Sequence, residues 1–142
     1  MKSTDRPQET IIPVCAAALI RDGRLLVGRR NQGVADSGRW ELPGGKLLPG
    51  EEPRTCLARE IFEEFGVRAQ IGDLFDVTNY RRGRRSILLI VYRASIPTGD
   101  FSSSDHDLLV WADPRQLAGL DFLEADRPIV RRLMEELSLG EA

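Results

Sequence analysis

Apolar residues along this chain fall into short blocks, and most of these blocks have the length and pattern of β-strands. The run from Ile11 to Ile20 is apolar throughout, is short for a helix and carries Pro13 near its start, so we expect a strand that is covered on both faces. Asp22-Gly23 then predicts a hairpin turn at 21–24 that leads into a returning strand at 25–30. Further strands are predicted at 40–42, 70–78, 86–96 and 108–111.

One segment has the period of a helix instead. Leu57, Ile61 and Phe65 recur four residues apart and form an apolar stripe. Pro53 suits the first turn of such a helix, and Gly66 suits its C-terminal stop.

A second helix is predicted to begin near Asp126, and a short helical turn is expected at 113–117. The apolar positions of the second helix are Ile129, Val130, Leu133, Met134 and Leu137. Two long helices for five or six strands predict an α/β fold, with a mixed β-sheet sandwiched between α-helices. We expect a flexible N-terminal arm at 1–10 and a single domain at 11–142.

Composition narrows the classes of function. The net charge of −2 and the pI near 5.5 provide no basic surface for nucleic acid, so no nucleic-acid partner is expected. No apolar run approaches the roughly 20 residues that span a bilayer, and the polar N-terminus lacks a signal sequence. Cys15 and Cys56 have neither a zinc spacing nor a disulfide framework, and we expect both to be buried and reduced. The default location is therefore cytoplasmic.

The first predicted helix also carries a cluster of carboxylates. Glu60 and Glu64 lie one turn apart with Glu63 beside them, and Arg59 is the only base nearby. A solvated helix face is one explanation, although like charges four residues apart destabilise a helix by roughly 0.2–0.5 kcal/mol per pair. The other explanation is a site for Mg²⁺, with Mn²⁺ as a substitute, because these ions prefer hard oxygen ligands.

The segment from Gly45 to Val67 resembles the Nudix box, G-x5-E-x7-R-E-U-x-E-E-x-G-U, in which U is a bulky apolar residue. Every specified position matches, which makes accidental agreement improbable. This resemblance implies the Nudix fold and hydrolysis of a nucleoside diphosphate linked to another moiety. The matching residues are Gly45, Glu51, Arg59, Glu60, Ile61, Glu63, Glu64, Gly66 and Val67.

The resemblance also implies roles within the site. The metal ligands it implies are Glu60, Glu63, Glu64 and the carbonyl of Gly44, with Asp105 completing the set from a later loop. Glu60 is the first candidate for general base and Glu64 the second, while Arg59 orients the glutamates and Glu51 anchors the turn. His106, the only histidine, is expected at the surface.

Two segments outside the box, 40–46 and 125–130, are similar to those of MutT-type and CTP pyrophosphohydrolases. That branch converts a nucleoside triphosphate to the monophosphate and pyrophosphate. The implied partner is therefore a small nucleotide. The substrate-binding residues carried over are Arg30 against the base, Lys46 and Arg85 against phosphate, and Leu42 and Asp126 beside the base.

Asp126 leaves the base open, because MutT has asparagine there. An ionised aspartate only accepts hydrogen bonds, which suits the amine of cytosine or adenine, whereas a protonated one also donates to oxidised guanine. Asp126 is equally a good N-cap for the following helix. The basic turn at 81–85 has two readings as well, a solvated hairpin tip or arginines that lean over an anionic substrate.

Three other functions compete with a triphosphate pyrophosphohydrolase. They are a nucleotide-binding regulator without turnover, a hydrolase of another nucleoside diphosphate derivative such as ADP-ribose, and an RNA-end hydrolase. The intact box glutamates disfavour the first, and the acidic pI disfavours the last. A monomer and a homodimer are both compatible with the sequence.

Overall fold

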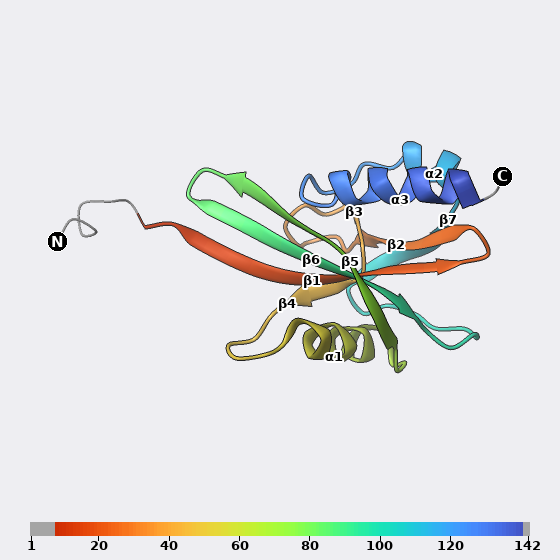
Figure 1. Cartoon of the computed structure of the whole chain (residues 1–142), viewed down its shortest axis with the longest axis horizontal. Helices are drawn as coiled ribbons and strands as arrows, with labels where there is room; N and C mark the ends of the chain where they lie inside the picture. Colours follow the sequence, from red (N-terminus) through yellow and green to blue (C-terminus); the bar gives the residue numbers. More distant parts are fainter. Residues whose placement is uncertain (1–7, 141–142) are drawn as a thin grey trace.

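The computed structural model describes residues 8–140 and contains a mixed β-sheet with helices on both faces (Figure 1). Helix α1 covers one face, and α2 and α3 cover the other. This confirms the predicted sandwich architecture. The elements are β1 (Thr10–Arg21), β2 (Arg24–Arg30), β3 (Trp40–Glu41), β4 (Gly44–Lys46), α1 (Pro53–Phe65), β5 (Gln70–Arg82), β6 (Arg85–Ser95), β7 (His106–Ala112), α2 (Pro114–Ala118) and α3 (Arg127–Gly140).

Strand β1 is the centre of the sheet. The order is β3-β2-β1-β6-β5, with β4 paired to β1 and β7 paired to β2. Strand β1 runs parallel to β6 over most of its length and antiparallel to β2 and β4. Its position beside β4 brings the start of the Nudix-like segment against the middle of the sheet.

Side chains of β1 alternate between two hydrophobic cores, as expected for a strand covered on both faces. Ala16 and Ala18 face the core under α3, where Leu133 is fully buried. Cys15, Ala17 and Leu19 face the core under α1. Cys15 and Cys56 are not bonded to each other and are both fully buried, which confirms the predicted burial.

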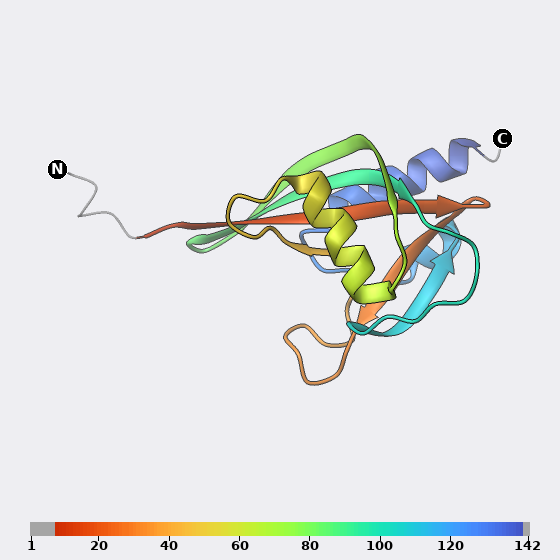
Figure 2. The ribbon, with the colours of Figure 1, turned by 90° about the horizontal axis from the view of Figure 1, so that it is seen from below.

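Helix α1 begins and ends where its sequence predicts. Pro53 occupies its first turn, and Gly66 adopts a left-handed conformation (φ 72°) whose N–H donates to the Phe62 carbonyl. Leu57 and Ile61 are fully buried under the helix, which crosses the sheet as Figure 2 shows. One face of the helix is thereby fixed to the sheet, with Glu64 buried and Glu60 partly buried beside it.

Several boundaries differ from the predictions. Strand β1 already begins at Thr10, inside the expected arm, because the Thr10 N–H donates to the Arg84 carbonyl across the β5–β6 turn; residues 1–7 lie outside the described residues. Strand β5 extends to Arg82, because polar residues remain paired with β6 up to the turn at Gly83. Strand β7 starts at His106, not at 108. No helix in the described chain is long and apolar enough to cross a membrane.

Candidate active site

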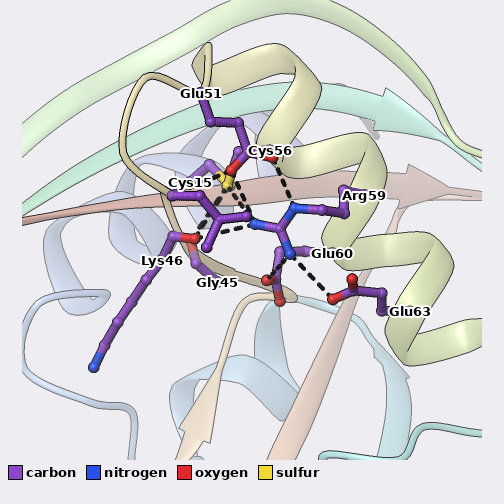
Figure 3. Close-up of polar contacts among 9 residues, drawn as sticks. Cys15, Gly45, Lys46, Glu51, Cys56, Arg59, Glu60 and Glu63 are labelled. Atoms are coloured by element: carbon purple, nitrogen blue, oxygen red, sulfur yellow. Dashed lines mark hydrogen bonds and ion pairs between the residues drawn. The ribbon is translucent and has the colours of Figure 1, made fainter.

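Arg59 gathers three carboxylates, Glu51 from the loop before α1 and Glu60 and Glu63 from α1 itself (Figure 3). Its Nε and Nη2 donate to the two oxygens of Glu51 at 2.7 and 2.9 Å, and its Nη1 donates to Glu60 at 2.7 Å and to Glu63 at 3.1 Å. The hydrogen bonds from Arg59 are the main reason that the pKa of Glu51 falls to about 2. The positive charge of Arg59 therefore offsets the repulsion among these glutamates.

Glu51 also ties down the loop before α1. Its Oε1 accepts from the Leu48 N–H at 3.0 Å, so one carboxylate holds both the turn and Arg59. This geometry fits the anchoring role implied for Glu51.

Two adjacent glycines let the backbone of β4 pass very close to its neighbours. A Cβ at Gly45 would lie 2.2 Å from Oε1 of Glu60, and one at Gly44 would lie 2.0 Å from the Cys15 carbonyl oxygen. Any larger residue at Gly45 would push the Glu60 carboxylate away. Gly45 thus allows β4 to lie against the Glu60 carboxylate of α1, and Gly44 allows it to lie against β1.

Glu64 differs from its neighbours because it is buried, at 5% exposure. Its Oε1 lies 2.9 Å from Nδ1 of His106, while its Oε2 is buried without a hydrogen-bond partner. Burial raises the pKa of Glu64, and the hydrogen bond from His106 opposes that rise. Glu63, in contrast, is exposed and contacts Arg59.

The expectation that His106 lies at the surface is wrong. The residue is 6% exposed, and its Nε2 lies 2.8 Å from Oε2 of Glu41. Desolvation alone would lower the pKa of His106, but hydrogen bonds to Glu41 and Glu64 outweigh it and raise the pKa to about 9. Sequence reasoning missed this group because only the pairing of β2 with β7 places the ring over Gly28.

One large cavity of about 830 Å³ opens beside these groups. It is bounded by β1, β4 and β6, by the loop after β2 and by the segment that precedes α3. Arg59, Glu63 and Glu64 lie outside its lining. The candidate residues that line it are Arg30, Leu42, Gly44, Lys46, Glu60, Arg85, Asp105 and Asp126.

Asp126 and Arg30 form one wall of this cavity. Oδ2 of Asp126 accepts from the backbone N–H of Leu42 at 2.9 Å, and Arg30 donates to Oε1 of Glu41 at 3.0 Å. The Asp126 side chain thus connects the segment before α3 to the backbone of Leu42. Among the described residues it accepts from Leu42 and not from an N–H of the first turn of α3. Burial raises the pKa of Asp126 to about 7.

The two candidate phosphate contacts, Lys46 and Arg85, are exposed at the cavity. The Lys46 side chain extends away from the Arg59 cluster, as Figure 3 shows, while its backbone carbonyl accepts from Arg59 at 3.3 Å. The turn that includes Arg85 is exposed over 81–85, as expected of a hairpin tip, although Arg82 and Arg85 also border the cavity.

The carboxylates of Glu60, Glu63 and Glu64 do not converge on a single point. Within residues 8–140, no three His, Cys, Asp or Glu side chains form a ready cluster for a metal ion, because Arg59 draws Glu60 and Glu63 and His106 draws Glu64. The donor set nevertheless fits a hard divalent cation: all the groups offer oxygen, and Oε2 of Glu64 is buried and unpaired.

Comparison with known proteins agrees with this architecture. A family model described as the NUDIX domain matches residues 12–138. The CTP pyrophosphohydrolase of Escherichia coli K12 is 31% identical over 126 residues, which cover 87% of this chain and 92% of that protein. A putative 8-oxo-dGTP diphosphatase 2 of Mycobacterium tuberculosis H37Rv is 34% identical over 128 residues, covering 88% of this chain and 89% of that protein.

Among solved structures, the solution structure of the E. coli ORF135 protein superimposes with a TM-score of 0.76 at 31% identity, over 89% of this chain and 91% of that one. The family model spans the sheet, α1 with its carboxylates and most of α3. The chain therefore belongs to the Nudix family and is a Nudix hydrolase.

Proposed function

We propose that this Nudix hydrolase is a Mg²⁺-dependent pyrophosphohydrolase that converts a nucleoside triphosphate to the monophosphate and pyrophosphate, with 8-oxo-dGTP or CTP and dCTP as substrates. One observation carries the proposal: Glu60 and the Asp126–Arg30 wall open onto the same cavity, and exposed Lys46 lies at its edge. A cavity of about 830 Å³ is large enough for a nucleotide. The names of the E. coli and mycobacterial relatives support the same class.

Glu60, Glu63, Glu64, Asp105 and the Gly44 carbonyl would hold the Mg²⁺, for which Mn²⁺ substitutes. A divalent ion bound there supplies neutralisation of the phosphate oxygens and makes water easier to deprotonate. Arg59 then keeps the glutamates oriented through its bonds to Glu60 and Glu63. Arg59 is a positioning residue, because it holds the side chains that would bind the metal and does not itself contact the substrate.

Glu60 is the proposed general base. It accepts the proton of the attacking water while the bond between two phosphoryl groups breaks and pyrophosphate leaves. Burial raises the pKa of Glu60, which makes it a better proton acceptor than an exposed glutamate. Glu64 is the second candidate, but one of its oxygens is already bonded to His106.

The base is proposed to lie against Asp126, Arg30 and Leu42. With a pKa of about 7, Asp126 exists in both protonation states near neutral pH. The ionised form accepts from the amine of cytosine, and the protonated form donates to oxidised guanine. This is why both substrate classes remain in the proposal. Lys46 and Arg85 are proposed to contact the phosphates.

A panel of nucleotides tests the proposal. Purified protein is incubated with Mg²⁺ and each of CTP, dCTP, 8-oxo-dGTP, the ordinary triphosphates and ADP-ribose, and pyrophosphate and phosphate are measured separately. We expect pyrophosphate from at least one triphosphate and none after chelation of the metal. Turnover of ADP-ribose alone would favour a different Nudix hydrolase, and binding without turnover of any nucleotide would favour a regulator.

A further inference from the structure

His106 lies between Glu64 of α1 and Glu41 of β3. Its Nδ1 is 2.9 Å from Oε1 of Glu64, and its Nε2 is 2.8 Å from Oε2 of Glu41. Nε2 is hydrogen-bonded to Glu41, while Nδ1 lies within ion-pair distance of Glu64 and within hydrogen-bond distance of Ser103 Oγ. The imidazole therefore links the buried glutamate of the Nudix segment to a glutamate of β3.

The link continues to the cavity wall. The second oxygen of Glu41, Oε1, accepts from Nη1 of Arg30 at 3.0 Å. A continuous chain of bonds thus runs from Arg30 through Glu41 and His106 to Glu64. Its ends are the residue placed against the base and a candidate metal ligand.

The fold provides a fitted space for the imidazole. The His106 side chain is only 1% exposed, and a Cβ added at Gly28 of β2 would lie 2.5 Å from a ring carbon. The register of β2 with β7 shifts between Arg29 and Arg30, where Arg30 is paired with His106. Ser103 adds a third contact, with its Oγ 2.8 Å from Nδ1. The ring is consequently held in one orientation from several sides.

We propose that His106 is a positioning residue that couples base recognition to the metal site, by holding Glu41 against Arg30 through one nitrogen and Glu64 through the other. This inference rests on the proposed function for the identity of the two sites. It assigns His106 no contact with substrate. It explains why a buried ionisable residue stands between two elements that each bear functional carboxylates.

Two substitutions separate the two bonds. The amide nitrogen of asparagine superimposes on Nδ1, so His106→Asn keeps the donor toward Glu64 and loses the one toward Glu41. The amide of glutamine superimposes on Nε2, so His106→Gln does the reverse. A residue that merely fills space would affect both sites alike in both variants.

The readouts do not require turnover. Affinity for Mn²⁺ alone is measured by electron paramagnetic resonance, and base preference as the ratio of dissociation constants for CMP and GMP. His106→Gln should weaken Mn²⁺ binding by about tenfold, the lower end for loss of a group behind a metal ligand, with the nucleotide ratio unchanged. His106→Asn should change the ratio by about fivefold, the scale of one lost hydrogen bond, with Mn²⁺ affinity unchanged.

Asp107→Asn is the matched control, because Asp107 is the next residue of β7 and pairs with Arg29 at the surface. It should alter neither readout. Gly28→Ala keeps His106 but displaces its ring, so both readouts should change, and a variant in which neither changes would overturn the proposal even if the side-chain variants do not fold.

Equal changes of both readouts in His106→Asn and His106→Gln, or no change in either, would overturn the coupling. A wild-type protein that binds CMP and GMP equally would overturn its base-recognition half. Failure of the proposed function would give a different result. No triphosphate would release pyrophosphate, while the protein would still bind Mn²⁺ and the two variants would still differ in the predicted way.

Discussion

Three glutamates of a single helix, Glu60, Glu63 and Glu64, lie in three different environments. Glu63 is exposed, Glu60 is half-buried against Gly45, and Glu64 is buried against His106. Chemically identical side chains thus differ in burial and in partners because of the surface that each one faces, and burial raises the pKa of Glu60 and of Glu64. A solvated helix face, one of the two explanations considered from sequence, therefore describes Glu63 but not the buried Glu64.

We predict that Glu63→Gln and Glu64→Gln both lower turnover by orders of magnitude but differ in stability. Glu63 makes an exposed ion pair, so its loss should cost about 0–1 kcal/mol. Glu64→Gln weakens a buried charged hydrogen bond to His106 and should cost about 1–3 kcal/mol. Urea denaturation of the two variants checks this. Equal stabilities would contradict the buried environment of Glu64, and near-full activity in either would contradict its role as a metal ligand.

A second residue-scale prediction concerns Asp126 and pH. Its pKa is about 7 in the folded protein against an ordinary 3.8, so between these values the unfolded chain ionises while the folded protein retains the proton. Stability is therefore lost as pH rises through this window. Asp126→Asn removes the effect, and its carbonyl oxygen can still accept from Leu42.

The free energy of unfolding of Asp126→Asn should consequently rise relative to that of the wild type between pH 4 and pH 7, and the difference should reach about 2–4 kcal/mol at pH 8. Thermal unfolding at pH 4.5 and pH 8 measures the difference. If the stability of Asp126→Asn relative to the wild type were the same at both pH values, Asp126 would not take up a proton when the protein folds. The substrate panel adds an independent result: an unchanged profile in Asp126→Asn would remove this residue from base recognition.

At the scale of secondary structure, β4 passes close to both β1 and α1. The adjacent glycines Gly44 and Gly45 allow these two approaches, one each. Gly44 (φ 154°) faces the rigid backbone of β1, whereas Gly45 faces the end of the flexible Glu60 side chain.

We therefore predict opposite outcomes for alanine at the two positions. Gly44→Ala should destabilise the protein by about 2–4 kcal/mol, since the new Cβ meets a main-chain carbonyl in a strained conformation. Gly45→Ala should leave the melting temperature nearly unchanged and lower turnover, because Glu60 is displaced. Circular dichroism and the pyrophosphate assay distinguish the two. A Gly45→Ala variant with full activity would mean that the position of Glu60 against β4 is unimportant.

At the scale of the whole molecule, the candidate site is assembled from segments far apart in the chain. Arg30 ends β2, Glu60 comes from α1, Asp105 from the loop before β7, and Asp126 from the segment that precedes α3. Arg59 and His106 contact carboxylates of this site from different elements.

A ligand that binds only the folded protein must stabilise it as a whole. Mg²⁺ at about 100 times its dissociation constant should add about 2.7 kcal/mol to the free energy of unfolding, with a corresponding rise in melting temperature. Chelation should reverse the rise, and Glu60→Gln should reduce it. If Glu60→Gln responded to Mg²⁺ as strongly as the wild type, the cation would be bound elsewhere.

The features that could be predicted from sequence depend on neighbours along the chain. Helix α1 follows from the spacing of Leu57, Ile61 and Phe65 between Pro53 and Gly66, because a helical period is a local property. The same period places Glu60 next to Glu64, and the box resemblance supplied the family. Strand β1 and the Asp22-Gly23 hairpin are equally local.

Tertiary structure alone decided which of these side chains meet. The Asp126 carboxylate reaches the Leu42 N–H across 84 residues, and His106 reaches Glu41 across 65. Such contacts depend on the register of β2 with β7 and on where α3 packs, and a shift of one residue would turn the side chains to the other face. The chain's own sequence therefore determined that a carboxylate helix exists, while the packing of distant strands determined that His106 is buried against Glu64 and not exposed at the surface.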